Sequence, residues 1–222
     1  MNQAALGFRA HSGWTSLVAI ALEDGSPMVL LRQRPQLVKT FTFEFRQPYH
    51  TAEKVPRSEA RGVIARIQAE ARGLAYHAIR SVQKRLLTEG YEVQYGGLLL
   101  ASGRPLPSLA QILESHALIH TADGELFRNV LLHACKRCGI EIFTAKEREL
   151  MGMSAEELGI QPEEIKRRLA DLGIGLGPPW TQDEKLASLI AWISLMKRRS
   201  RKNGELYISL PNVEIKEVSN EC

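Results

Sequence analysis

Cysteine is scarce in this chain, which contains only three in 222 residues. Two of them, Cys135 and Cys138, form an isolated Cys-x-x-Cys with no second pair at comparable spacing. A structural zinc site needs about four ligands, and a disulfide-stabilised fold needs a denser, paired set of cysteines. We therefore expect Cys135 and Cys138 to be two small buried thiols in the last turn of a helix.

Long apolar runs are also missing. A membrane-spanning helix needs about 18 or more consecutive apolar residues, and the sequence has no such run. The first residues lack the basic and then continuously apolar pattern of a signal peptide. The length fits one large domain or one and a half small ones, and an apolar content of 44% is ordinary for a protein with a buried core. We therefore expect a cytoplasmic protein without a membrane partner.

The net charge of +4 is small but unevenly distributed. The segment from Arg57 to Arg85 contains seven Lys or Arg residues against two Glu, and a second basic cluster lies within residues 197–202. Basic clusters attract phosphate backbones. They are also common on solvated helix faces and at helix C-termini, where the helix dipole favours cations. Charge alone therefore leaves both nucleic-acid binding and the absence of a ligand open.

The first third of the chain predicts three strands, over residues 4–10, 14–23 and 28–34, of which the last two are joined by the turn signal Asp24-Gly25-Ser26-Pro27. The alternation of phenylalanines with polar residues from Phe41 to Phe45 predicts a further short strand with three phenylalanines on one face. Residues 47–56 are interpreted as a connector, in which His50 carries no signal of its own.

Helical spacing of apolar residues over 58–88 predicts one very long helix. Further strands are expected at 96–101, 140–144 and 205–210. Shorter helices are expected over 108–113, capped by Ser108, over a segment capped by Thr121, and in pieces between 146 and 177. The last helix, residues 182–196, is expected to begin after Thr181 as its N-cap.

Three local stretches carry a resemblance. Leu6-Gly7-Phe8 with Gly13-Trp14-Thr15 looks like the first hairpin of Holliday-junction resolvases, and 122–126 and 181–187 look like two of their helix starts. The element order βββαβαβα resembles the ribonuclease H-like superfamily, and similar stretches occur in bacterial proteins. The resemblance implies an α/β fold in which helices cover both faces of a mixed sheet. It also implies one domain over residues 1–200, with a helical insertion at about 146–177, followed by a C-terminal strand and tail at 201–222.

Nucleases of this superfamily hold two cations about 4 Å apart with carboxylates. The resemblance places Arg9 where their first strand carries an aspartate and Ser102 where their fourth strand ends in a glutamate. Only Asp183 and Glu184 stand near an expected acidic position. A two-metal nuclease and a divalent metal cofactor are therefore disfavoured.

The resemblance brings the ends of the first and fourth strands and the start of the last helix into one cleft. The candidate ligand-binding residues there are Arg9, Ser12, Ser102, Arg104, Trp180 and Asp183. Arginines beside helix N-termini would hold an anion, such as the phosphate of a nucleotide or sugar. Alternatively, the candidate catalytic residues His11, His120 and Asp183 would hold a single cation. A third interpretation gives His116 and His120 only hydrogen-bonding roles.

The leading hypothesis is a non-nucleolytic ribonuclease H-like protein that binds nucleic acid or a phosphorylated small molecule in this cleft. One alternative is a metal-dependent nuclease or hydrolase with a rearranged His/Asp site. Another is a protein-interaction domain without a ligand. The sequence leaves the identity of the ligand and the oligomeric state open.

Overall fold

The computed structural model describes residues 1–101 and 105–202. In this part of the chain, one five-stranded sheet has the order β3-β2-β1-β4-β5. Strand β2 runs antiparallel to both of its neighbours, and β1, β4 and β5 run parallel. The strands are β1 (Asn2–His11), β2 (Trp14–Glu23), β3 (Ser26–Gln33), β4 (Tyr91–Leu100) and β5 (Glu141–Lys146).

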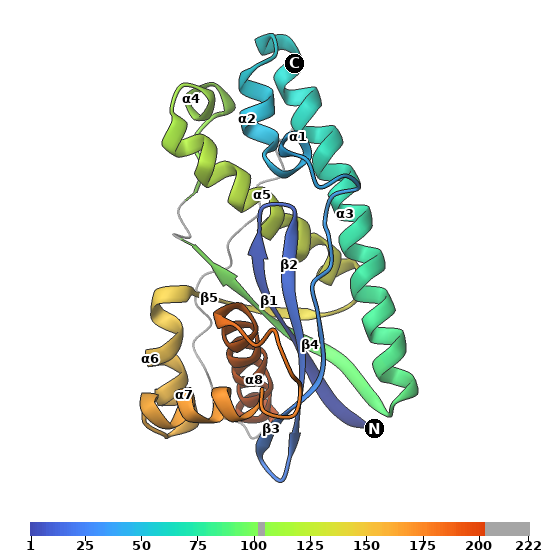
Figure 1. The fold of residues 1–222 in the computed structure, drawn as a ribbon, viewed down its shortest axis with the longest axis vertical. Coiled ribbons are helices and arrows are strands. Elements are labelled where there is room, and N and C mark those ends of the chain that lie inside the picture. Colours follow the sequence, from blue (N-terminus) through green and yellow to red (C-terminus); the bar gives the residue numbers. More distant parts are fainter. Residues whose placement is uncertain (102–104, 203–222) are drawn as a thin grey trace.

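Helices cover both faces of this sheet (Figure 1), which confirms the predicted mixed α/β fold. One face carries the long helix α3 (Arg57–Thr88) and α5 (His116–Arg137), with the short helices α1 (Phe43–Arg46), α2 (Pro48–Glu53) and α4 (Leu109–Leu113) beside them. The other face carries α6 (Glu147–Leu158), α7 (Pro162–Asp171) and α8 (Gln182–Lys202).

The alternation of side chains along β1 decides which face each residue serves. Leu6 and Phe8 belong to the core cluster that contains residues of α3 and α5, whereas Ala5 packs with residues of α8. Because successive side chains in a strand point to opposite faces, Arg9 and His11 continue the series on the α8 side. Strand β1 therefore places the side chains of Arg9 and His11 in the region where α8 begins.

Two paired glycines allow α8 to lie close to the sheet. Gly7 of β1 is the register partner of Gly97 of β4. A Cβ atom at Gly7 would overlap the backbone carbonyl of Ala187, and one at Gly97 would lie 2.7 Å from the carbonyl oxygen of Ile190. Only glycine leaves room for these backbone contacts, so this pair fixes the depth at which α8 packs.

The prediction of a fourth early strand at 41–45 is wrong. This segment contains α1, and the expected connector contains α2, which begins at Pro48. Proline is favoured in the first turn of a helix and cannot donate to a sheet. The three phenylalanines do not share a buried face either, since Phe41 and Phe43 are exposed while Phe45 packs against the core.

The predicted start of α5 is also wrong. The helix begins at His116, so Thr121 lies inside it and donates its hydroxyl to the carbonyl of Ala117. Asp123 therefore lies in the third turn of the helix and not in its first, and it is buried. A helix thus starts without a side-chain cap at Ser115, because apolar contacts such as those of Ile119 hold its first turns.

Other predictions are confirmed. The long helix begins one residue before the predicted Ser58 and ends at Thr88, and Ser108 forms a capping box with Gln111. Cys135 is buried as predicted, and burial raises the pKa of its thiol. The prediction for Cys138 is wrong, because this residue is the C-cap of α5 and is only partly buried. The predicted strand at 205–210 lies outside the described residues. No helix in the described ranges is long and apolar enough to cross a membrane.

Candidate functional site

Four segments that are distant in the sequence meet at one edge of the sheet. Strands β1, β3 and β5 all run in one direction, because β1 and β3 are both antiparallel to β2 and β5 is linked to β1 through parallel β4. Their carboxyl ends therefore share an edge, and α8 starts beside it. We call the titratable side chains that meet there the strand-end cluster, and its members are Arg9, His11, Arg34, Glu147 and Asp183.

Arg9 is the centre of the strand-end cluster. Its Nε and Nη2 donate to the two carboxylate oxygens of Glu147 at 3.2 and 3.1 Å, which is a bidentate pair. Its Nη1 donates to Oδ1 of Asp183. The side chains of Arg9 and Asp183 are only 24% and 14% exposed, so solvent screens this ion pair less than a surface pair.

His11 contacts the second oxygen of the Asp183 carboxylate. Its Nε2 lies 3.0 Å from Oδ2 of Asp183, and its ring stacks on Trp14 with 4.0 Å between centroids. Burial, together with the charges of Arg9 and Arg34, lowers the pKa of His11 to about 4. The ring is therefore neutral at pH 7.

Arg34 completes the strand-end cluster from the end of β3. Its guanidinium carbon lies 3.8 Å from the centroid of the Trp14 ring, and its Nη2 lies 3.6 Å from Oδ2 of Asp183. Half of this side chain is exposed. Arg34 is therefore the cation of the cluster that a ligand in solution can reach.

These residues do not fit the pair of divalent cations that nucleases of this fold use. Such a site needs several carboxylates around a shared ion. In this protein the two carboxylates, Glu147 and Asp183, form ion pairs with the guanidinium of Arg9 instead. A fixed positive charge between them repels a metal ion. The carboxylate of the neighbouring Glu184 is also already bound, because it accepts hydrogen bonds from the backbone N–H and hydroxyl of Thr181 at the start of α8.

The structure brings together only some of the predicted site residues. Arg9, His11 and Asp183 meet, whereas the backbone carbonyl of Ser12 accepts a hydrogen bond from Nε of Arg46 at 3.3 Å. Trp180 donates its indole N–H to the carbonyl of Leu169 and packs on Gly173 instead of joining the cluster. Ser102 and Arg104 lie outside the described residues.

Sequence reasoning missed two members of the cluster, Arg34 and Glu147. Both follow strands that run in the direction of β1. The signal for Glu147 was present, but the strand before it was predicted to end at Thr144. That shorter strand assigned Glu147 to a helical insertion, away from the sheet edge.

Beside the cluster, the segment 41–54 presents exposed aromatic rings next to cations. Phe41 and Phe43 are 45% and 51% exposed. The guanidinium of Arg46 lies 4.3 Å from the centroid of the Phe41 ring, and Nζ of Lys54 lies 4.9 Å from that of Phe43. The hydrogen bond between Arg46 and Ser12 joins this segment to the β1–β2 turn.

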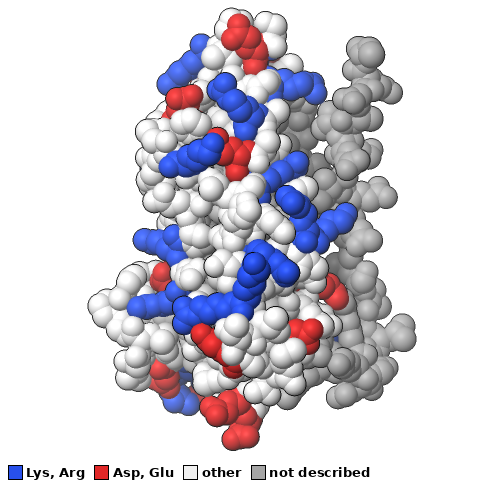
Figure 2. Space-filling view, turned by 90° about the vertical axis from the view of Figure 1, so that its right-hand side faces the viewer, with Lys and Arg blue, Asp and Glu red and all other residues white. Residues whose placement is uncertain are grey.

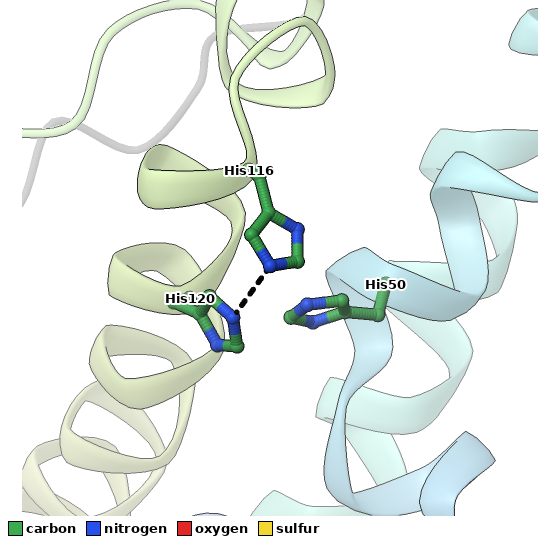
Figure 3. Close-up of side chains that lie close together, drawn as sticks. All are labelled: His50, His116 and His120. Atoms are coloured by element: carbon green, nitrogen blue, oxygen red, sulfur yellow. Dashed lines mark hydrogen bonds between the residues drawn. The ribbon is translucent and has the colours of Figure 1, made fainter.

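His120 belongs to a different group of side chains. It lies with His116 on α5 and with His50 on α2, as Figure 3 shows. Within residues 1–101 and 105–202, His120 makes no hydrogen bond or ring contact with His11 or Asp183. The predicted trio of His11, His120 and Asp183 is therefore divided between two places.

The comparisons with known proteins bear on the fold. A scan of protein-family models finds no match to this sequence, and a search of curated proteins finds none either. The structure is similar to Thermus thermophilus RuvC in complex with a Holliday junction substrate, with a TM-score of 0.52 and 11% identity over 91% of this chain and 97% of that one. A second RuvC structure from Thermus thermophilus gives a TM-score of 0.52 and 11% identity, over 89% of this chain and 96% of that chain. The chain therefore has the ribonuclease H-like fold that its element order implied.

Proposed function

We propose that this protein binds nucleic acid at the strand-end edge of its sheet and does not cleave it. The main observation in support of binding is a set of cations and aromatic rings beside that edge: the exposed Arg34, Lys54, Phe41 and Phe43 and the half-buried Arg46. Proteins that bind single strands combine basic side chains for the backbone with aromatic side chains on which bases stack. The proposed ligand is therefore nucleic acid with unpaired nucleotides.

The chemistry of Arg9 supports binding without cleavage. Metal-dependent cleavage needs cations that stabilise the attacking and leaving oxygens. In this protein the guanidinium of Arg9 pairs with both Glu147 and Asp183, and Arg34 supplies the second positive charge that balances these two carboxylates. Nε2 of His11 lies 3.0 Å from Oδ2 of Asp183, so both oxygens of this carboxylate have a neighbour within the cluster.

Two further observations agree with a nucleic-acid partner. RuvC, which has a similar fold, was solved in complex with a Holliday junction. Helix α3 adds a basic surface, and Figure 2 shows Lys and Arg side chains along the length of the face on that side of the molecule. A positive surface of this kind raises the local concentration of a polyanion.

The test of binding uses the full chain, with labelled single-stranded, duplex and four-way-junction DNA at low salt. We expect the single strand, or unpaired nucleotides in the junction, to bind best. The double variant Phe41→Ala/Phe43→Ala is expected to weaken binding by about 10-fold or more, since stacking contributes about 1–3 kcal/mol per base. Leu87→Ala is the matched control, because Leu87 is similarly exposed but lies on α3.

Three outcomes would overturn the proposal. Absence of binding at low salt would favour the protein-interaction hypothesis. Competition by a mononucleotide as effective as that by the polymer would instead favour a phosphorylated small molecule. Cleavage in Mg²⁺ or Mn²⁺ that Asp183→Asn abolishes, while circular dichroism shows that variant folded, would establish a nuclease.

A further inference from the structure

A second cluster of polar side chains lies between α2 and α5, and the strand-end cluster does not involve it. We propose that His50, His116 and His120 bind one divalent transition-metal ion of the zinc type. In the described part of the chain, this is the only group of three or more His, Cys, Asp or Glu side chains whose ligand atoms all lie within 4.8 Å of one another. The proposal stands independently of nucleic-acid binding.

The spacing on α5 suits a metal ion. His116 and His120 are four residues apart, so both rings lie on one side of the helix, and their Nε2 atoms are 3.0 Å apart. Two nitrogen ligands of a tetrahedral zinc ion, each about 2.0–2.1 Å from the metal, lie about 3.3 Å from each other. The two exposed side chains therefore need little movement to share an ion.

His50 approaches this pair from the other helix. The centroid of its ring lies 4.4 Å from that of His120 and 5.3 Å from that of His116. Figure 3 shows the three rings gathered in the space between α2 and α5. Three imidazoles from two helices make a set of three protein ligands, which in zinc proteins leaves a fourth position for water or another small ligand.

A buried carboxylate fixes the orientation of His50. Nδ1 of His50 lies 2.5 Å from Oδ2 of Asp123, and Oδ1 of Asp123 accepts a hydrogen bond from the backbone N–H of Tyr49 at 2.7 Å. Asp123 is only 2% exposed. When Nδ1–H of His50 donates to this carboxylate, Nε2 keeps its lone pair free for a metal. A carboxylate behind a ligating histidine is a common arrangement in metal sites, where it fixes the tautomer of the ring.

The ligand chemistry selects the class of metal. Imidazole ligands favour Zn²⁺, Cu²⁺, Ni²⁺ and Co²⁺, whereas Mg²⁺ and Ca²⁺ prefer oxygen. The ion would link α2 to α5. It would also lie close to the exposed ring of Phe43, whose centroid is 5.8 Å from that of His50.

The experiment uses the full chain without a histidine tag, freed of metal by dialysis against a chelator. Zn²⁺ is titrated against a chromogenic competitor, and Co²⁺ is titrated while the visible absorption of four-coordinate cobalt is recorded. We expect one ion per chain. His116→Ala and His120→Ala are expected to abolish the cobalt spectrum, and Asp123→Asn to weaken zinc binding by about 10- to 100-fold.

Two variants serve as controls. His77→Ala removes an exposed histidine on α3, and Cys138→Ser removes a partly buried thiol, so both should bind like the wild type. Circular dichroism checks that each variant is folded, and the exposed positions of His116 and His120 keep the test informative if Asp123→Asn fails to fold. Absence of stoichiometric binding by the wild type, unchanged binding by both His116→Ala and His120→Ala, or loss of binding in Cys138→Ser would overturn the proposal.

Discussion

At the scale of single residues, Arg9 holds the strand-end cluster together. Removing its side chain leaves Glu147 and Asp183 without their main partner. Exposed ion pairs contribute below about 1 kcal/mol, whereas breaking a buried pair costs about 3–5 kcal/mol. Because this pair is partly buried, we expect Arg9→Ala to lower the free energy of unfolding by about 1–3 kcal/mol, measured by urea denaturation.

The matched comparison is Lys39→Ala, which removes a lysine that pairs with Glu70 at 3.5 Å and is 70% exposed. Its expected effect is below about 0.5 kcal/mol. Equal effects of the two substitutions would show that Arg9 contributes no more than an ordinary surface charge.

His11 makes stability depend on pH. Its pKa is about 4 in the folded protein, against 6.5 as its ordinary value. Between these values the unfolded chain binds a proton that the folded chain does not, so stability is full above about pH 6.5 and falls as the pH decreases toward 4. We expect the contribution of His11 to be about 2 kcal/mol, less than the full shift implies because solvent reaches the ring.

The measurement is the free energy of unfolding of wild type and His11→Gln at intervals between pH 7 and pH 4. The difference between the two curves should change over this window, because only the wild type carries the histidine. Parallel curves would mean that other groups cause the acid sensitivity. Burial also raises the pKa of Asp123, so comparison with a His11 variant is needed to separate the two effects.

At the scale of elements, the contact between α8 and the sheet positions Asp183. Gly7→Ala would force the backbone of α8 away from β1, because its Cβ overlaps the carbonyl of Ala187. Overpacking of this kind costs about 1–3 kcal/mol, and thermal denaturation should show a loss in that range. Gly62→Ala is the matched control with the opposite sign, since nothing lies within 4 Å of its added Cβ on α3. Replacing glycine by alanine inside a helix gains about 0.5–1 kcal/mol.

The elements with strong local signals could be predicted from the sequence. Helix α3 repeats its apolar spacing over many turns, and Ser108 with Gln111 forms a capping box, so both were found nearly to the residue. The helix in segment 41–45 was not predicted, because alternating phenylalanines indicate a strand only if one face of the strand is buried. Burial depends on packing against α2 and the β1–β2 turn, which a local pattern does not contain.

The candidate sites depend even more on the tertiary structure. Arg9 and Asp183 were expected to meet because the order of elements places β1 beside α8. His50 carried no signal, since the connector that contains it folds as α2 and only then faces α5. The buried pair of His50 and Asp123 joins residues 73 positions apart, and nothing in either local sequence indicates the other.

At the scale of the whole molecule, two basic regions of the described chain are candidates for contact with phosphate, the strand-end edge and the surface of α3. The salt dependence of binding measures which region touches phosphate, because each contact to a single strand changes the slope of log K against log salt by about 0.7. If the ligand lies along the strand-end edge, Arg34→Ala should reduce the slope by about that amount. Arg66→Ala, at an exposed position on α3, should leave it unchanged. The reverse pattern would place the nucleic acid on α3 and leave the exposed phenylalanines without a role in binding.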